Sequence, residues 1–327
     1  YKNAFMSVEM AKKAIDLYWE MFNLGKNGIK DSSITFFGGE PLLNKQVVLE
    51  SAKYIRALDE KSGIETKIVL MTNGTLVTKE FSREAKRYNL IVIVSLDSSE
   101  TNHNEHRKDK FGKGSFDKVT KGLEILKKEG CEIIISTVLT PSSVSDNNIL
   151  LPIIKEFGVK EMSMKPLIES MDIDSYIQGV VKYAIKHFEE AKKIGIDEFQ
   201  VSAIKKSFVL GFPVSEGTLD CSCFMYGNQI VVWTDGAIST CEKMKDSSIG
   251  NLQTSIRELI QNKNELAEKL KQRLPTFNEE CEDCEFNEIC GGGCAFTARC
   301  ITGDLMKKDP LNCAYSKEIW RLLGSKS

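Results

Sequence analysis

The sequence has little of several features that would decide the class of the protein at once. No apolar run approaches ~18 residues, so no segment has the length of a membrane-spanning helix. The formal net charge is −2, which gives no overall basic field for nucleic acid or an anionic membrane surface. Before residue 221 the only cysteine is Cys131. With 42% hydrophobic and 28% charged residues, the 327-residue chain can bury a sizeable core and is not typical of a disordered protein.

Helical and strand patterns alternate through the first two thirds of the chain. Apolar residues recur at helical spacing over residues 7–23, where Ser7 is a suitable N-cap, and Ser115 is expected to cap a later helix. Short apolar runs predict strands at 34–37, 68–71, 91–94, 133–138 and 162–165, and helical patterns occupy 47–58, 79–87, 116–126, 147–156 and 173–193. This alternation predicts a parallel sheet covered by helices, in a full or partial β/α barrel or a doubly wound sheet.

The last third of the chain has a different pattern. Residues 209–222 are punctuated by Gly, Pro and Ser, which predicts a boundary between an α/β domain (1–208) and a smaller domain (209–327). Asp235-Gly236 lies between two β-rich runs and predicts a hairpin. Helices are expected over 255–271 and 314–323.

Small and polar residues follow three consecutive predicted strands. Gly38-Gly39-Glu40-Pro41 comes first, with two glycines that allow a ligand to approach the backbone and a carboxylate suited to an ammonium group. Asn73 follows the second strand, and Ser95 and Asp97 follow the third. Because the carboxyl ends of parallel strands meet at one edge, these residues predict a ligand pocket, with ordinary turns as the alternative.

The segment 98–114 reads as a highly charged loop. We expect His103 and His106 in it to face water, since no third soft ligand accompanies them as a metal site would require. Arg107, in the same segment, could clamp a carboxylate with two hydrogen bonds.

The cysteines gather in the last third of the chain. Soft thiolates in such number, in a chain without a signal peptide at its start, indicate iron–sulfur clusters, with zinc and disulfides as alternatives. Cys131 opens a predicted strand and is most simply a core residue. The spacing is Cys223-x12-Gly236-x4-Cys241, then Cys281-x2-Cys284-x5-Cys290-x3-Cys294, then Cys313.

These residues, in this order, resemble the radical S-adenosylmethionine (SAM) enzymes with a C-terminal SPASM domain, most of all the maturases of ribosomally made peptides. The resemblance implies a partial (β/α)6 barrel of the radical SAM type, followed by a small domain with a β-hairpin and two iron–sulfur sites. It implies that SAM is held by three sets of residues, with Ser98 where relatives usually carry glycine. The sets are Gly38, Gly39, Glu40 and Pro41 for the methionyl amino group, Asn73 for the ribose region, and Ser95, Asp97 and Arg107 for a second polar contact.

By the same resemblance, the cysteines hold two auxiliary [4Fe–4S] clusters. The fourth ligand of the first cluster is Cys221, Cys300 or a substrate thiolate, and the sequence does not decide among them. Glu242 directly follows Cys241 and is implied to be the catalytic base, with a solvated surface carboxylate as the alternative. The implied ligands are Cys223, Cys241 and Cys294 for the first cluster, and Cys281, Cys284, Cys290 and Cys313 for the second.

One departure from the family pattern concerns the C-x3-C-x2-C motif of the SAM-cleaving cluster, which this sequence does not contain. We expect it to lie in a segment ahead of Tyr1, where it would hold a third [4Fe–4S] cluster. A chain that truly lacked that segment would be inactive.

The resemblance leads to a hypothesis of function. The protein would abstract a hydrogen atom from a precursor peptide to install a thioether or related cross-link, with electrons from a flavodoxin- or ferredoxin-type donor. We expect a cytoplasmic enzyme that binds neither nucleic acid nor membranes. The alternatives are an anaerobic sulfatase-maturing enzyme, which generates formylglycine, and a non-catalytic iron–sulfur or zinc-binding protein.

Overall fold

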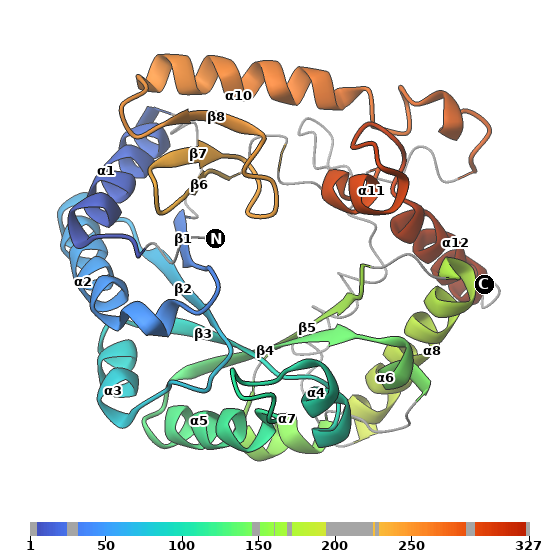
Figure 1. The fold of residues 1–327 in the computed structure, drawn as a ribbon, viewed down its shortest axis with the longest axis horizontal. Helices are drawn as coiled ribbons and strands as arrows, with labels where there is room; N and C mark the ends of the chain where they lie inside the picture. Colours follow the sequence, from blue (N-terminus) through green and yellow to red (C-terminus); the bar gives the residue numbers. More distant parts are fainter. Residues whose placement is uncertain are drawn as a thin grey trace. The chain divides into compact units, whose positions relative to one another are not determined.

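Five strands form a sheet in the first part of the chain (Figure 1). Their spatial order equals their chain order, and the register places Ser32 beside Thr66, Ile68 beside Leu90, and Ile91 beside Glu132 in parallel pairs. A doubly wound sheet reverses its strand order at a switch point, so the sequential order supports the partial barrel. The strands are β1 (Ser32–Phe36), β2 (Thr66–Thr72), β3 (Leu90–Ser95), β4 (Glu132–Leu139) and β5 (Glu161–Pro166).

The structure is a computed structural model that describes residues 5–24, 32–145, 151–159, 161–168, 172–193, 225, 229–285 and 292–324. Two compact units make up the chain. One comprises Tyr1–Lys165 and Glu189–Ala203, and the other comprises Pro166–Phe188 and Ile204–Ser327. The expected domain boundary at 209–222 lies outside the described residues and stays a prediction. No helix among the described residues is long and apolar enough to cross a membrane.

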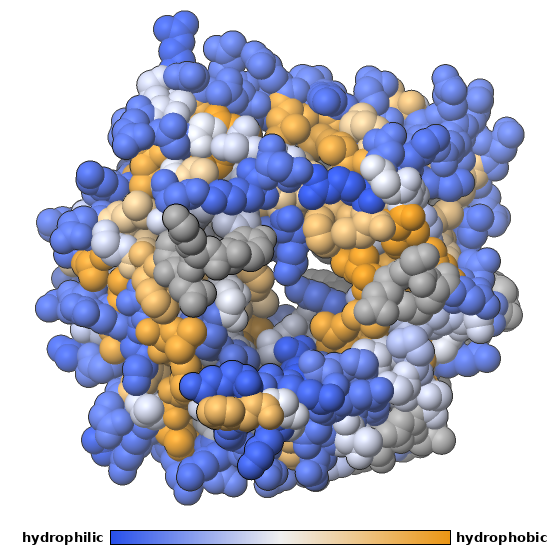
Figure 2. Space-filling model, in the orientation of Figure 1, coloured by the Kyte–Doolittle hydropathy of each residue, from blue (hydrophilic) through white to orange (hydrophobic). Residues whose placement is uncertain are grey.

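Helices cover one face of the sheet. Figure 1 shows α2, α3 and α5 along this face, and the side chains of β3 that point to it, Leu90, Val92 and Val94, are at most 1% exposed. The apolar residues that alternate with them on β3 are only half-buried, so the sheet's other face is the more open one. Hydrophilic side chains dominate the outward faces of α1 and α2 (Figure 2). The helices of this unit are α1 (Val8–Leu24), α2 (Lys45–Ser62), α3 (Lys79–Arg87), α4 (Glu100–His106), α5 (Phe116–Lys128), α6 (Pro141–Ser145) and α7 (Leu151–Phe157), with the short 3-10 helix η1 (Pro41–Asn44).

The helix starts follow local side-chain chemistry. Ser7 accepts a hydrogen bond from the backbone N–H of Met10, as predicted, and Thr78 accepts one from that of Phe81. Ser115 stands before α5, but its side chain makes no capping hydrogen bond. Ser115 therefore occupies the predicted N-cap position but does not cap through its hydroxyl, which is engaged with the Arg107 carbonyl and the His103 ring.

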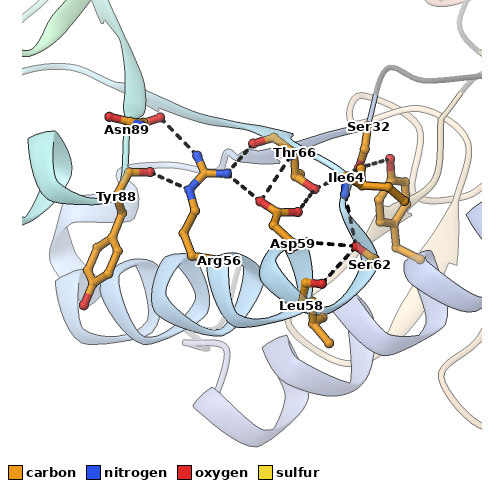
Figure 3. A network of polar contacts seen from close by, with 10 residues as sticks. Ser32, Arg56, Leu58, Asp59, Ser62, Ile64, Thr66, Tyr88 and Asn89 are labelled. Carbon is orange, nitrogen blue, oxygen red and sulfur yellow. Dashed lines mark hydrogen bonds and ion pairs between the residues drawn. The ribbon is translucent and has the colours of Figure 1, made fainter.

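A polar network joins the amino ends of β1, β2 and β3 to α2 (Figure 3). Arg56 donates to the carboxylate of Asp59 (2.6 Å) and to the carbonyls of Thr66 (2.7 Å) and Tyr88 (3.0 Å). The hydroxyl and backbone N–H of Thr66 both donate to Asp59, at 2.7 and 3.2 Å. Because the Thr66 proton is used in this way, the hydroxyl of Ser32 donates to Thr66. The network closes the end of the sheet opposite to the predicted pocket.

The second unit contains a small antiparallel sheet and several helices. Its strands are β6 (Val231–Val232), β7 (Ala237–Ser239) and β8 (Ser248–Asn251), and Gly236 takes a φ of 83° in the turn between the first two. The predicted hairpin is confirmed, while β8 was not predicted. The helices are α8 (Ile173–Lys193), which belongs to this unit as far as Phe188, α10 (Ile256–Lys271), α11 (Ala295–Thr302) and α12 (Pro310–Gly324), with the 3-10 helix η3 (Glu279–Cys281).

We expect Asp59→Ala to lower the free energy of unfolding by about 2–4 kcal/mol, because it leaves the Arg56 cation without its counter-ion and two Thr66 donors without an acceptor. The thermal unfolding midpoint of anaerobically purified protein measures the change. Glu60→Ala is the matched control, since Glu60 is the exposed neighbour on the same helix. Equal midpoints for the two variants would show that the network does not stabilise this unit.

Candidate functional site

The carboxylate of Glu40 joins the carboxyl ends of β1 and β2. Its Oε1 accepts hydrogen bonds from the N–H of Leu42 (2.9 Å) and the hydroxyl of Thr72 (2.8 Å), and its Oε2 accepts one from the N–H of Asn73 (2.8 Å). Glu40 thus caps η1 and fixes the end of β2. An ammonium group at this carboxylate would share it with these three donors.

The backbone of Gly38 and Gly39 lies open beside Glu40. A Cβ atom at either glycine would have no heavy atom within 4 Å, and both residues are exposed. Their carbonyl groups can therefore accept hydrogen bonds from a ligand. Pro41 begins η1 and fixes the direction in which the chain leaves.

Asn73 begins the turn after β2. Its Oδ1 accepts from the N–H and the hydroxyl of Thr75, at 3.0 and 2.7 Å, while its Nδ2 has no partner among the described residues. Gly74 follows with a φ of 76°, and a Cβ there would lie 2.9 Å from Val94. The turn thus packs closely against β3 and leaves the Asn73 amide N–H groups to donate to a ligand.

Asp97, two residues beyond β3, is the centre of a second set of contacts. It is 4% exposed, and Arg107 donates to it from Nε (2.7 Å) and Nη2 (3.1 Å). The N–H of Val138 also donates to Asp97, at 3.1 Å, which ties β3 to β4. The Nε edge of the guanidinium is therefore occupied by the protein, and Nη1 remains for a ligand carboxylate. Ser95 ends β3 and is half-buried.

Four residues, including Asp97 and Arg107, form a closed ring of hydrogen bonds through side chains and backbone groups. The Asp97 N–H donates to Nδ1 of His103 (3.3 Å), and Nε2 of His103 lies 2.9 Å from the hydroxyl of Ser115. Because Ser115 gives its own proton to the Arg107 carbonyl, His103 must donate to Ser115 from Nε2. Arg107 completes the ring by donating to Asp97.

The prediction that His103 faces water is wrong. The segment predicted as a loop contains α4, which Ser99 caps by accepting from the N–H of Asn102, and His103 is fully buried. Burial lowers the pKa of His103 from 6.5 to about 4, which the charge of Arg107 supports and that of Asp97 opposes. His106 is exposed, as predicted. The N-cap residue Ser99 was the feature of the sequence that could have revealed this helix.

In the second unit, Cys241 follows the hairpin and is 9% exposed. Its sulfur accepts a hydrogen bond from the N–H of Lys243 (3.4 Å), and it packs in one core with Ala295, the residue that follows Cys294. Glu242 is half-buried next to it, and its Oε2 accepts from the amide of Gln229 (3.3 Å). The structure thus brings the neighbourhoods of Cys241 and Cys294 together.

The other described cysteines lie on helices or turns of this unit, apart from Cys131. Cys281 ends η3, and the N–H of Cys284 donates to its carbonyl (3.1 Å). Cys313 lies on α12 and lines a pocket of about 410 Å³, together with charged residues that include Asp172 and Lys317. Cys300 is exposed on α11. No disulfide joins any two of the seven described cysteines.

Three predicted ligands, Cys221, Cys223 and Cys290, lie outside the described residues. Within the described part of the chain, no group of three or more His, Cys, Asp or Glu side chains is placed to hold a metal ion. The chemistry of the unit nevertheless fits an iron–sulfur cluster, because thiols are present with an N–H donor to sulfur. The ligand sets stay a prediction.

Comparison with known proteins identifies the two parts of the chain. The radical SAM superfamily matches residues 6–149, and the SPASM iron–sulfur cluster-binding domain matches residues 221–285. A cysteine-type anaerobic sulfatase-maturating enzyme of Clostridium perfringens is 26% identical over 285 residues, which cover 80% of this chain and 73% of that protein. The radical SAM cyclopropyl synthase TigE of Paramaledivibacter caminithermalis is 27% identical over 98% of this chain and 66% of its own length.

The chain is also similar to a bacteriocin biosynthesis protein and to solved structures. The antilisterial bacteriocin subtilosin biosynthesis protein AlbA of Bacillus subtilis is 27% identical over 88% of this chain and 60% of its own length. Native anSMEcpe with bound AdoMet superposes with a TM-score of 0.77 at 23% identity, over 100% of this chain and 90% of that one. Streptococcus suis SuiB bound to precursor peptide SuiA gives a TM-score of 0.61 at 14% identity, over 93% of this chain and 69% of that one. These structures share the fold.

The two family matches fall on the two regions that the structure builds differently. The radical SAM match covers β1 to β4, whose carboxyl ends carry the polar residues, and the SPASM match covers the hairpin and Cys241. The chain therefore belongs to the radical SAM superfamily: it is a radical SAM enzyme with a SPASM iron–sulfur domain, and its cofactors are SAM and [4Fe–4S] clusters.

Proposed function

We propose that the enzyme removes a hydrogen atom from a ribosomally made precursor peptide and installs a thioether or a related cross-link. The observation that carries the proposal is Glu242, a half-buried carboxylate that directly follows Cys241 and is held by Gln229. The name of AlbA, a bacteriocin biosynthesis protein, supports a peptide-maturing role, as does the shared fold with SuiB, which was solved with a precursor peptide.

The proposed reaction removes one hydrogen atom, one proton and one electron from the peptide as a thiol sulfur joins a carbon atom. When bound, SAM and the clusters supply the hydrogen-atom abstraction and accept the electron. Glu242 takes the proton as general base. Its hydrogen bond from Gln229 keeps the carboxylate oriented in the hairpin. A flavodoxin- or ferredoxin-type protein provides the reducing electron.

Residues at the strand ends of the first unit hold SAM in this proposal. The open carbonyls of Gly38 and Gly39 and the carboxylate of Glu40 receive the ammonium group, next to Pro41. Asn73 donates from Nδ2 to the ribose region, and Arg107, backed by Asp97, donates from Nη1, with Ser95 beside it. The ring through His103 forms this side of the pocket in advance, so less free energy is lost on ordering it when SAM binds.

The cysteines divide between two auxiliary clusters, as the family pattern implies. Cys241 and Cys294, whose neighbours share one core, belong to the first cluster with Cys223. Cys281, Cys284, Cys290 and Cys313 hold the second. Cys300 is exposed on α11, whereas Ala295 and Ala298 of that helix are buried, which favours Cys221 or a substrate thiolate over Cys300 as the fourth ligand of the first cluster.

A second candidate function is formylglycine generation in a sulfatase. The similarity to the sulfatase-maturating enzyme of Clostridium perfringens and the TM-score of 0.77 to anSMEcpe favour it. That reaction also removes a hydrogen atom, a proton and an electron, so Glu242 has the same role in it. The two reactions differ in whether a new carbon–sulfur bond forms.

Product analysis separates the two candidates. We expect the reduced, SAM-loaded enzyme to remove two hydrogens and one alkylatable thiol from a cysteine-rich precursor peptide for each cross-link, as measured by mass spectrometry before and after alkylation. A sulfatase-derived peptide carrying cysteine, in the same assay, should stay unchanged. Loss of sulfur from that peptide, with a product that reacts with a hydrazide, would establish the sulfatase reaction instead.

We expect Glu242→Gln to slow product formation by about 10²-fold or more, because the substrate proton loses its acceptor. Iron content and SAM binding should stay unchanged. Glu282→Gln is the matched control, because Glu282 also directly follows a predicted ligand but is exposed. Equal rates for both variants would show that Glu242 is not the base.

We expect His103→Ala to weaken SAM binding to the holoenzyme by about tenfold, because it opens the ring that holds Asp97 and Arg107, at about the cost of one hydrogen bond. His103→Gln keeps one donor and one acceptor and should recover most of the affinity. Calorimetric titration with SAM measures both variants. Unchanged affinity in His103→Ala would show that the ring does not shape the pocket.

The same residue predicts a pH dependence of stability. The pKa of His103 falls from 6.5 to about 4 on folding, so the unfolded chain binds the proton more readily. The stabilisation from neutral His103 is complete above pH ~6.5 and is lost as the pH falls toward ~4. The thermal midpoint should therefore drop more between pH 7.5 and 5.5 in wild type than in His103→Gln. Both proteins keep His187, whose pKa is also lowered by burial, so the difference isolates His103.

A further inference from the structure

Arg273, just after α10, is the largest of the fully buried side chains, at 1% exposure. A guanidinium group carries five N–H donors and a permanent charge. Two long hydrogen bonds run from Nη2, to the carbonyls of Gly292 and Lys307, both at 3.4 Å. Nε and Nη1 are buried and have no hydrogen-bond partner among the described residues.

The carbonyl that Arg273 contacts belongs to the glycine segment that leads into Cys294. A Cβ at Gly292 would lie 2.9 Å from the carbonyl oxygen of Arg273. A Cβ at Gly293 would lie 2.5 Å from the Cβ of Asp309. Both glycines have positive φ, of 76° and 69°. The glycine segment is thus held between the backbone of Arg273 and Asp309, with no space for a larger residue.

Asp309 fixes the next residue of this segment. It is 5% exposed, and its Oδ2 accepts a hydrogen bond from the N–H of Cys294 at 2.8 Å, while its Oδ1 accepts from the N–H of Asn312 at 3.2 Å. Each carboxylate oxygen thus accepts a backbone N–H, and no ion pair within 4 Å joins Asp309 to Arg273 among the described residues. Burial raises the pKa of Asp309, and the charge of Arg273 opposes that rise. Arg273 therefore keeps a buried charge without a close counter-ion, and two unused donors, beside Gly292 in the segment that leads into Cys294.

Such an arrangement is unfavourable without an anion. Burying an unpaired charge costs several kcal/mol or more, and each buried donor left without a partner costs about 1–3 kcal/mol. An iron–sulfur cluster with its thiolates is a negatively charged group whose sulfur atoms accept hydrogen bonds, and its reduction potential responds to nearby charge and to those bonds. The two unused donors of Arg273 match this chemistry.

We propose that Arg273 is a positioning and potential-setting residue of the auxiliary cluster that Cys294 helps to hold. Its unused N–H groups donate to cluster or thiolate sulfur, and its charge stabilises the reduced cluster, which carries one more electron. The reduction potential of this cluster is thereby raised, so that it accepts the electron of the proposed reaction more readily. The inference rests on Cys294 being a ligand of the cluster.

Redox titration of the holoenzyme, followed by EPR of the cluster signal that does not respond to SAM, tests the role. We expect Arg273→Met to lower the ratio of reduced to oxidised cluster about tenfold at a fixed solution potential, which equals a shift of about 59 mV. Arg273→Lys keeps the charge and should shift the potential less. Arg257→Met, at an exposed position of α10, is the matched control. An unchanged potential in an Arg273→Met protein with normal iron content would overturn the proposal.

A measurement on the wild-type enzyme covers the case in which Arg273→Met does not fold. With 15N-labelled arginine, pulsed EPR of the reduced cluster should show a nitrogen coupling that disappears in Arg273→Lys. Absence of the coupling in wild type would overturn the proposal by itself. Cys294→Ala tests the underlying assignment separately, because iron content that stays at the wild-type level would show that Cys294 is not a ligand. If Cys294→Ala loses iron but Arg273→Met leaves the potential unchanged, only the role of Arg273 is refuted.

Discussion

The pocket edge of the first unit depends on carboxylates that accept hydrogen bonds from the ends of neighbouring strands. Glu40 binds the N–H of Asn73 beyond β2, and Asp97 binds the N–H of Val138 in β4. Strand ends in a sheet leave backbone donors without partners, and a carboxylate can satisfy several of them at once. The same two groups therefore fix the edge of the sheet and give it a negative character suited to a cationic ligand.

Positive charge plays the corresponding part around Cys294. The sulfur of Cys241 accepts a hydrogen bond from the N–H of Lys243, and the guanidinium of Arg273 is buried beside Gly292, two residues before Cys294. The glycine segment before Cys294 packs so closely that its backbone is set by its neighbours rather than by its own side chains. In the first unit, the carboxylates of Glu40 and Asp97 accept hydrogen bonds from backbone N–H groups. In the second unit, the Arg273 cation and the Lys243 N–H suit the negatively charged cluster that we propose.

Most elements of the fold could be predicted because their signals are local. The helix α3 and the strands β1 to β5 follow from periodicity, and the hairpin follows from Asp235-Gly236. The prediction failed where tertiary contacts bury a residue or engage its side chain in a way that the local sequence does not indicate. The charged segment around His103 forms a short helix whose histidine is buried by Phe116, at a ring distance of 5.7 Å. Ser115 occupies the N-cap position of α5, but its hydroxyl donates to the Arg107 carbonyl and accepts no hydrogen bond from the first turn.

The sequence by itself determined the family, the order of helices and strands, the residues at the strand ends and the spacing of the thiols, because motifs and periodicity are properties of neighbouring residues. Only the tertiary structure decided how Arg107 divides its donors between Asp97 and a ligand, and which tautomer His103 takes. It alone buried the Arg273 guanidinium beside Gly292. Burial and hydrogen-bond direction depend on residues far apart in the chain, and a charged side chain is expected at the surface until the fold encloses it.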